Sequence, residues 1–414
     1  MNRRVERDTA LICAAAFLRS LTVGVVGVVL AIYLARTRFD ALTIGLVIGS
    51  GLTGSALATL LVARYGDTFG RRRSLAVLAA LTAVGYAGLL ETASLAALVG
   101  IAFLGMLNGM GRDRGAATAL DQAVLPDTTG FERRTWVLAW YNVVLDCGHA
   151  LGALAAATPT LLVRSGAFST TGAHRVTFLA CAGVMLASLG IYASLSDRVE
   201  VQKHRGSDCL PRPLDAQSHR RVTRLALLFG LDSLGGGFLN SALIAYWFFA
   251  RYGMSEAELA VLFFVARLLN TGSHVAAAWV AHRVGLVNTM VLTHLPSSLF
   301  LMAAPAAPSA TLAAALFLAR EALVEMDVPT RQSYVVGIVH PEERTFASAM
   351  TNVVRSAGWA AGPSVAGVIM QHLALSGPLI IGGTLKIAYD IILYFSFRRV
   401  HPPEEITQVP GTRS

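Results

Sequence analysis

Between two long apolar runs lies the stretch Ala63-Arg-Tyr-Gly-Asp67-Thr-Phe-Gly70-Arg71-Arg72-Arg73. Roughly twenty apolar residues precede it and a similar run follows, so each run is long enough to cross a hydrocarbon core of about 30 Å. The four arginines of the stretch place it on the cytoplasmic side, because cytoplasmic loops carry an excess of Lys and Arg. Gly66 and Gly70 permit a tight backbone there. The stretch therefore predicts a cytoplasmic turn between two membrane-spanning helices.

The composition of the whole chain indicates the same class. The 414 residues are 54% hydrophobic, have a mean hydropathy of +0.58 and are only 14% charged, against about a quarter in soluble domains. The bases behind the net charge of +9 sit in short loops between apolar runs, which argues against a nucleic-acid partner. The four cysteines are scattered without metal-ligand spacing, so we expect no metal and no cofactor.

The apolar runs predict an all-α polytopic membrane protein of about twelve spanning helices. Basic loops are the amino terminus, 64–73, 112–134, 197–224, 282–283, 331–344 and the tail from Arg398. They alternate with loops that carry two arginines or fewer, so both termini are expected in the cytoplasm. The chain divides into a six-helix half at 1–196, a charged cytoplasmic linker at 197–224, a second half at 225–397 and a cytoplasmic tail at 398–414. The predicted spans lie at 11–34, 42–62, 75–90, 95–111, 137–162, 176–195, 225–249, 259–280, 286–304, 311–326, 346–372 and 379–397.

An internal repeat relates the two halves. The residues Asn-Val-Val occur at 142–144 and again at 352–354, which is 210 residues later (352 − 142). Two parallel repeats are typical of transporters whose substrate site lies near the midplane between the halves. Further matching positions are Gly148 with Gly358, Gly152 with Gly362, and Arg19 with Asp232 at an offset of 213 (232 − 19).

The basic stretch resembles motif A of the major facilitator superfamily, which reads G-x-L-a-D-r-x-G-r-r. The matching residues are Asp67, Gly70, Arg71 and Arg72, whereas Ala63, Tyr65 and Thr68 depart from the motif. With the repeat, the resemblance covers the whole chain and implies a secondary transporter of two pseudo-symmetric six-helix bundles, not an enzyme. It also implies that Asp67 and Arg71 latch the cytoplasmic side by facing the start of the eleventh helix around Thr345.

Two further motifs of this superfamily match in part. The fourth helix keeps Asn108, Gly109 and Gly111 of motif B, but Gly105 replaces its arginine. The fifth helix keeps the glycines of the antiporter motif C without its proline. The complete G-x-x-x-G-P pattern appears in the eleventh helix as Gly358, Gly362 and Pro363. These residues are candidates for gating, with close helix packing as the alternative.

Ionisable residues inside the predicted spans are costly in hydrocarbon and mark candidate sites. The proton-coupling candidates are Asp146, Asp232, Glu321 and Glu325; for the two glutamates, neutralisation of nearby arginines is the alternative. Because Arg19 and Asp232 are repeat equivalents, we expect an ion pair between the halves. Lys386 and Asp390 lie four residues apart on the last helix and are expected to neutralise each other.

Polar and aromatic residues of the spans supply the substrate-cavity candidates: Arg19, Tyr141, His149, Asn240, Arg267, Arg320, Arg355 and Trp359. Without a phosphate-binding G-x-x-x-x-G-K-[ST] motif, the energy must come from a gradient. The sequence favours a monomeric, proton-coupled exporter of a small organic solute in the inner (plasma) membrane, with the lipid bilayer, the solute and protons as its partners. The alternative is uptake of an anionic metabolite, for which the arginines would form a basic cavity.

Overall fold

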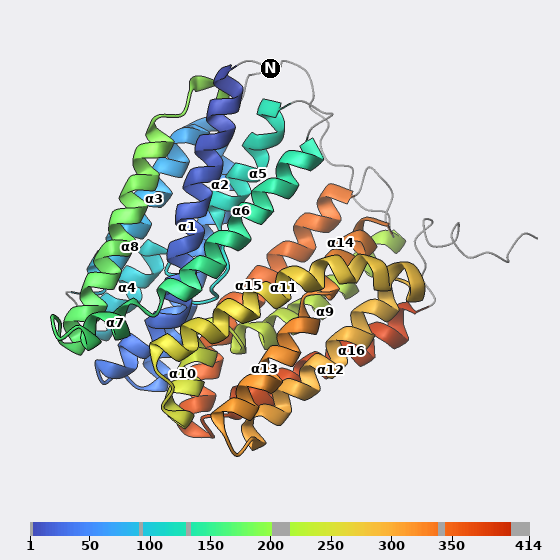
Figure 1. Cartoon of the computed structure of the whole chain (residues 1–414). Coiled ribbons are helices and arrows are strands. Elements are labelled where there is room, and N and C mark those ends of the chain that lie inside the picture. The colour runs from blue at the N-terminus through green and yellow to red at the C-terminus, as the bar shows by residue number, and fades with distance from the viewer. Residues whose placement is uncertain (1–2, 91–93, 130–133, 201–215, 338–343, 399–414) are drawn as a thin grey trace, which may run out of the picture. The chain divides into compact units, whose positions relative to one another are not determined.

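The computed structural model describes residues 3–90, 94–129, 134–200, 216–337 and 344–398, and the regular elements in these ranges are helices (Figure 1). In chain order they are α1 (Arg3–Arg36), α2 (Ala41–Phe69), α3 (Arg71–Gly88), α4 (Leu95–Gly105), α5 (Ala116–Thr129), α6 (Arg134–Ala155), α7 (Thr158–Arg164), α8 (Thr170–Ala193), η2 (Asp197–Val199), α9 (Ala216–Phe238), α10 (Ser241–Tyr252), α11 (Glu256–Val284), α12 (Leu286–Ala303), η3 (Ala304–Ala306), α13 (Ala310–Val324), α14 (Asp327–Gly337), α15 (Arg344–His372) and α16 (Gly377–Phe397).

Seven segments of the described chain are long and apolar enough to cross a membrane. They are Arg7–Arg36, Ala41–Phe69, Val137–Arg164, Thr170–Ala193, Arg220–Tyr252, Leu286–Ala306 and Gly377–Phe397. The predicted spans at 75–90, 95–111, 259–280, 311–326 and 346–372 are not among these seven segments. The number of twelve spans therefore stays a prediction, whereas a helical, multi-span chain is confirmed.

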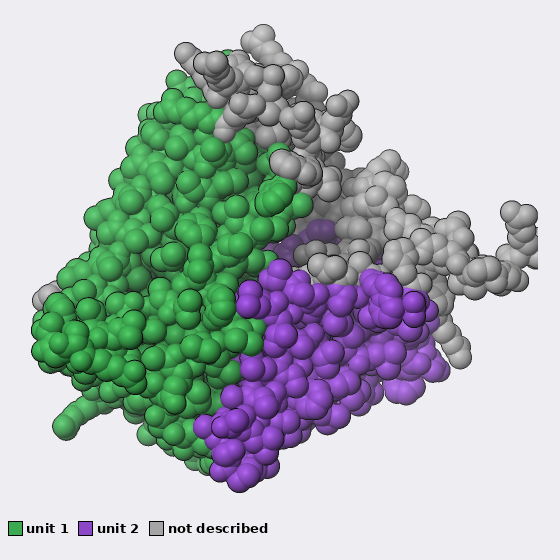
Figure 2. Space-filling view, in the orientation of Figure 1, with its two compact units in different colours: residues 1–205, 240–265, 363–375 green, residues 206–239, 266–362, 376–414 purple. Residues whose placement is uncertain are grey.

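The chain forms two compact units (Figure 2). Unit 1 comprises residues 1–205, 240–265 and 363–375, and unit 2 comprises residues 206–239, 266–362 and 376–414. The helices α11 and α15 thus each contribute to both units. The predicted division at the 197–224 linker remains a prediction, and residues 201–215 of that linker lie outside the described ranges.

Unit 1 is built around α1, which packs against α5, α6, α8 and α10. Its residues from Val25 to Leu34 are buried, because this part of α1 is apolar on all sides and a helix of that kind belongs inside a bundle. Arg19 lies on the same helix and is therefore held in the interior of the unit.

The glycines of the repeat bring the first and fifth spans of each half into backbone contact. A Cβ added at Gly24 of α1 would lie 2.5 Å from the carbonyl oxygen of His149 on α6. In unit 2, a Cβ added at Gly362 of α15 would lie 2.5 Å from the Cα of Gly237 on α9. Such distances leave no room for a side chain, so small residues are required at both contacts.

The fourth span is interrupted, which the sequence did not predict. We expected one helix at 95–111 and a basic loop at 112–134, but the chain leaves α4 at Met106 and resumes as α5, which runs to Thr129. Met106 and Gly111 have positive φ angles of 51° and 66°. Non-helical backbone at membrane depth must be buried in protein, and here the carbonyl oxygen of Gly109 accepts a bond of 3.0 Å from the amide of Ala242.

Unit 2 repeats this interruption. Helix α13 ends at Val324 and α14 begins at Asp327, so the loop predicted from residue 331 is in part helical. Asp113 and Asp327 are 214 residues apart (327 − 113), close to the offset of the sequence repeat. Asp113 lies in the break of its span and Asp327 begins the helix after the break, and both are buried.

The basic stretch that suggested a turn is almost entirely helical. Helix α2 continues to Phe69 and α3 begins at Arg71, so Gly70 alone separates them. Gly70 has a φ of +105°, a conformation that residues with a Cβ rarely adopt. The two helices therefore reach farther toward the turn than hydropathy indicated.

Candidate functional site: two buried ion clusters

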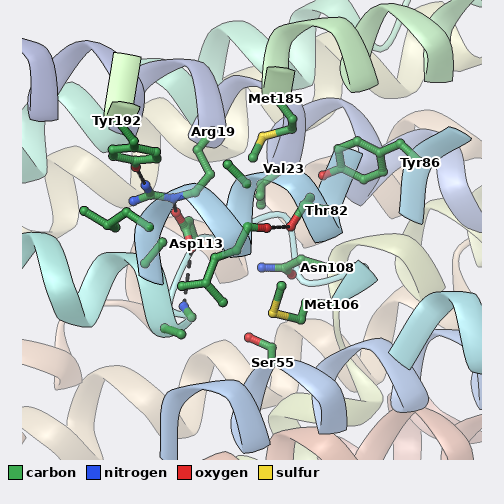
Figure 3. A pocket seen from close by; sticks show the side chains of 16 residues that line it. Arg19, Val23, Ser55, Thr82, Tyr86, Met106, Asn108, Asp113, Met185 and Tyr192 are labelled. Atoms are coloured by element: carbon green, nitrogen blue, oxygen red, sulfur yellow. Dashed lines mark hydrogen bonds and ion pairs between the residues drawn. The ribbon is translucent and has the colours of Figure 1, made fainter. Parts of the chain in front are cut away.

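The cluster of unit 1 is centred on the guanidinium of Arg19 (Figure 3). This group donates to the carboxylate of Asp113 and to the hydroxyl of Tyr192. It also donates to Asp121 Oδ2 at 2.9 Å and to the hydroxyl of Thr118 at 3.3 Å. A buried charge requires this degree of pairing. One base therefore binds two carboxylates in the described part of unit 1.

Further hydrogen bonds fix the two carboxylates. The hydroxyl of Tyr141 donates to Asp121 Oδ2 at 2.9 Å. The backbone amide of Asp113 donates to Nε2 of His149 at 2.9 Å, so this nitrogen carries no proton and His149 is neutral. The arrangement holds Asp113 at the helix break and brings together three sequence candidates: Arg19, Tyr141 and His149.

A cavity of about 50 Å³ lies beside this cluster. Its lining includes Arg19, Asp113, Asn108, Thr82 and Tyr192 (Figure 3). Because a cavity needs about 10–15 Å³ of such space to hold one water molecule, this one has room for a few waters. Arg19 lines the cavity, and its nitrogens donate to protein groups.

The cluster of unit 2 is centred on Asp232 of α9. Nζ of Lys386 on α16 donates to Asp232 Oδ1 at 2.6 Å, and a guanidinium nitrogen of Arg331 on α14 donates to Oδ2 at 3.2 Å. Arg331 also bonds Asp327 at 2.7 Å. All four side chains are buried. The cluster thus joins the first, fourth and last helices of unit 2 through charged groups.

His294 of α12 completes this second cluster. Its Nδ1 lies 3.0 and 3.1 Å from the two carboxylate oxygens of Asp390. On the other side of the ring, Nε2 lies 3.4 Å from Lys386 Nζ and 3.7 Å from Asp232 Oδ1. The predicted pairing of Lys386 with Asp390 is therefore wrong: each takes a different partner, because His294 projects between them.

The predicted ion pair between Arg19 and Asp232 is also replaced by partners within each unit. Arg19 binds acids of α5 and of the break before it, whereas Asp232 binds bases of α14 and α16. The repeat thus conserves the position of a charge on the first helix and reverses its sign. Each unit supplies the opposite charge from its own interrupted fourth span.

The other sequence candidates of unit 2 lie on α11, α13 and α15. Glu321 is buried, forms an ion pair with Arg320 and accepts a hydrogen bond of 2.8 Å from Asn270. Glu325 is the half-buried residue that ends α13. Arg267 is half-buried on α11. On α15 the guanidinium of Arg355 lies 4.6 Å from the ring centroid of Trp359. These contacts favour the neutralising role for Glu321.

Two candidates of unit 1 lie apart from the Arg19 cluster. Asp146 is half-buried on α6 and has no polar partner among the described residues. Asn240 is buried and caps α10, because its Oδ1 accepts a bond of 2.9 Å from the amide of Leu243. The position of Asn240 therefore has a local structural cause.

The gating candidates make contacts that stabilise helix ends and helix crossings. Asp67 binds Arg71 at 2.8 Å, with Asp67 exposed and Arg71 buried. The carboxylate of Glu200, which the sequence did not single out, accepts bonds from the amides of Arg71 and Arg72 at 2.7 and 3.2 Å. An acid at a helix N-terminus is favourable. The side chain of Thr345 lies outside the described residues, and Gly358, Gly362 and Pro363 sit on α15 at or beside its glycine contacts.

A third ion cluster joins helix ends on unit 1. Glu256 at the start of α11 binds Arg36 and Thr160, each at 2.9 Å, and lies 3.4 Å from His174 Nε2. Burial raises the pKa of Glu256, whereas the contacts with His174, Thr160 and Arg36 lower it to about 2. The carboxyl therefore stays ionised at any physiological pH.

Comparisons with known proteins agree with this architecture. A curated relative, the uncharacterized membrane protein YJR124C of Saccharomyces cerevisiae, is 26% identical over 95% of this chain and 94% of its own length. The crystal structure of the nucleoside transporter NupG superposes with a TM-score of 0.71 at 15% identity, covering 96% of this chain and 98% of its own. The D-xylose–proton symporter superposes with a TM-score of 0.71 at 15% identity, covering 97% and 99%.

These structural likenesses establish the fold alone. Sequence evidence is independent of them, because residues 12–324 match the profile of the Major Facilitator Superfamily. That segment includes the Arg19 cluster, the motif-A turn and His294. It also includes the first interrupted span and the second one up to its break at Val324. The chain is a multi-pass membrane protein and belongs to the major facilitator superfamily of secondary transporters.

Proposed function

We propose that this protein exports a small organic solute across the inner (plasma) membrane in exchange for protons. The observation that carries the proposal is the excess of buried acid in both described ion clusters. In unit 1 two carboxylates share one guanidinium. In unit 2 Asp232 and Asp327 bond two bases, and a third carboxylate, Asp390, bonds His294. An unbalanced buried charge is costly, and binding a proton removes it. Protons are therefore natural partners of both clusters.

The alternative is uptake of an anionic metabolite by a basic cavity. Arg19 and Arg320, two of the arginines that would supply the cavity, each contact carboxylates within their own unit. Arg355 lies over an aromatic ring. Guanidinium groups engaged in this way are not available to a carboxylate or phosphate ligand unless an ion pair breaks first. We therefore favour proton coupling to a solute without a required negative charge.

The match to motif A and the partial match to the antiporter motif C support the direction of export, whereas the missing arginine of motif B and the missing proline of motif C count against it. Fold relatives include a nucleoside transporter and a D-xylose–proton symporter, so uridine and D-xylose are reasonable neutral probes. Succinate is a matched anionic probe for the alternative. Alternating access between two conformations would expose the solute site to one side of the membrane at a time.

The test uses everted membrane vesicles with an acidic interior and radiolabelled uridine, D-xylose and succinate, followed by a wider panel chosen by thermal-shift binding. We expect accumulation of a neutral solute that collapses when a protonophore is added. Accumulation of succinate alone would support the alternative. If every solute that binds also moves without regard to the pH gradient, proton coupling is wrong.

A further inference from the structure

We propose that His294 and Asp390 form the proton-binding site of transport, and that a proton bound there opens the ion pair between Lys386 and Asp232. The inference rests on the proposed proton coupling and names the residues that perform it. None of the sequence motifs points to this pair, because His294 and Asp390 come together only through the packing of α12 against α16.

The first argument is the charge of the cluster. In the described part of unit 2, two carboxylates bond the bases Lys386 and Arg331, a third bonds His294, and the protonation of His294 sets the net charge. Tyr389 of α16 is another titratable side chain that faces His294, with ring centroids 6.0 Å apart. With His294 neutral the cluster is negative; with His294 protonated it is neutral. Further charged groups on the helices that pack against α12 are the bonded pair Arg320 and Glu321 of α13, and Glu325, which acts electrostatically on Arg331. The pair adds no net charge, and Glu325 favours the protonated form.

The second argument is the orientation of the ring. In the neutral form, Nδ1 donates its proton to Asp390, which leaves the lone pair of Nε2 facing the ammonium of Lys386 at 3.4 Å. Lys386 can therefore donate to Nε2 and to Asp232 Oδ1 at the same time. The imidazole is held between an acid and a base, and its second nitrogen is the one free to take a proton.

A proton taken from water by Nε2 converts this donor contact into a repulsion. The new N–H points toward Lys386, which cannot accept a hydrogen bond, and Asp232 Oδ1 is an acceptor 3.7 Å from Nε2. Imidazolium and ammonium then compete for one carboxylate oxygen, while Arg331 continues to hold Oδ2. Proton binding thus weakens the link between α9 and α16 and leaves the rest of the cluster intact. Loss of the proton restores the link.

The choice of base supports this role. The chain contains only two lysines, Lys203 and Lys386, among its 34 basic residues. A lysine is a compact charge on a flexible stem that can move between partners, whereas a guanidinium forms a rigid fork. Lys386 also approaches the position of a Cβ at Gly236 to 3.9 Å, beside the indole nitrogen of Trp359. The ammonium of Lys386 therefore lies close to the backbone of Gly236 and to the ring of Trp359.

The cluster of unit 1 lacks the same capability. Its surplus carboxylate, Asp121, is bonded by Arg19 and by the hydroxyl of Tyr141. Its histidine, His149, accepts at Nε2 from the backbone amide of Asp113, whereas His294 lies between a carboxylate and a lysine. A proton on Asp121 would separate no lysine from its partner. The geometry therefore assigns the mobile charge to unit 2.

The two lysines make a direct test possible without a known substrate. Purified protein with Lys203→Arg, labelled with ¹⁵N-lysine and ¹³C-histidine in lipid nanodiscs, reports Lys386 and the ten histidines by NMR during a pH titration. We expect one buried imidazole and the Lys386 ammonium to change with the same midpoint. In His294→Gln the Lys386 change should vanish. In Asp390→Asn the imidazole midpoint should move by about one pH unit or more, because the neighbouring charge is gone.

His372→Gln is the matched control, because this histidine is exposed at the end of α15. It should remove one imidazole signal and leave the Lys386 titration unchanged. The proposal is overturned if Lys386 is insensitive to pH in the wild type, or if its change persists in a folded His294→Gln protein. Size-exclusion behaviour and circular dichroism establish that each variant is folded.

Transport assays distinguish failure of this inference from failure of the proposed function. His294→Gln should lose accumulation driven by a pH gradient, down to that of empty liposomes, for whichever of uridine, D-xylose or succinate the wild type moves. It should retain exchange of the same solute at equal pH. Full proton-driven accumulation in His294→Gln overturns the site and leaves proton coupling standing. Coupled titration of His294 and Lys386 in a wild type whose transport ignores pH overturns the proposed function instead.

Discussion

The two units use the same layout with opposite charges. In unit 1 a base on the first helix, Arg19, is surrounded by acids and hydroxyl groups, and both carboxylates bond its one guanidinium. In unit 2 an acid on the first helix, Asp232, is shared by a lysine and an arginine from two helices. The first arrangement has one centre and no substitute for it. The second can lose one base and keep another, which is what a switching site requires.

The largest expected effect follows from the single centre of unit 1. Arg19→Gln leaves Asp113 and Asp121 buried with no cation among their described contacts. Removing one partner of a buried ion pair costs about 3–5 kcal/mol. We expect the variant to be recovered in low yield, with a strongly reduced thermal midpoint in detergent.

The double variant Arg19→Gln with Asp113→Asn controls for this loss, because it removes one of the two stranded charges. It should recover part of the stability. If the single Arg19→Gln protein is as stable as the wild type, the cluster of unit 1 does not depend on one base. The two clusters would then not differ in this respect.

Backbone contacts should be alike in the two units even though the charges differ. Gly152→Ala would place a Cβ 3.0 Å from the Cα of Gly24, and Gly362→Ala would place one 2.5 Å from the Cα of Gly237. Overpacking of this kind costs about 1–3 kcal/mol. We expect similar losses in thermal stability from the two substitutions.

Gly190→Ala provides the matched control, because nothing lies within 4 Å of a Cβ at this position of α8. Alanine is a better helix former than glycine by about 1 kcal/mol, so this variant should be neutral or slightly more stable. A large loss in unit 1 with none in unit 2 would show that the repeat conserves the glycines for different reasons.

A smaller effect is expected from removing a base in unit 2. Lys386→Met keeps the length and apolar stem of the side chain, and Arg331 still bonds Asp232 at 3.2 Å. The cost should be about 1–3 kcal/mol, that of leaving one buried acceptor unsatisfied, and less than the cost of Arg19→Gln. Thermal unfolding of the two variants side by side measures the difference, and equal losses would remove the contrast between the clusters.

The sequence predicted a helical membrane protein with an internal repeat, and it singled out Arg19 and Asp232 as site residues. Apolar runs, repeated glycines and charges inside apolar runs are local signals that can be read directly. It missed Asp113, Asp327 and Arg331, because hydropathy assigned them to loops. A sequence signal for Asp113 was present in Gly109 and Gly111, because glycines are poor helix formers and these two lie in the break between α4 and α5.

The sequence could not predict which charged side chains pair with one another, for a different reason. The spacing of Lys386 and Asp390 is ideal for a helical pair, but both side chains reach other helices instead. Cross-helix contacts depend on packing that a single sequence does not encode in any short pattern. The same limit applies to Glu200, whose bonds to the start of α3 span 129 residues of chain.

The smallest expected effect is that of Asp121→Asn, and it separates the two surplus charges most sharply. The amide oxygen can still accept from Arg19 and from the hydroxyl of Tyr141, which now bond Asp121 Oδ2 at 2.9 Å each. The change in stability should be below about 1 kcal/mol, because the hydrogen bonds remain while the unbalanced charge disappears. Proton-driven transport should persist, measured with the same solute and gradient as for His294→Gln. If Asp121→Asn is stable yet transports only at equal pH, the proton belongs to the cluster around Arg19. The sign reversal between the units would then mark unit 2 as the fixed half and unit 1 as the half that responds to protons.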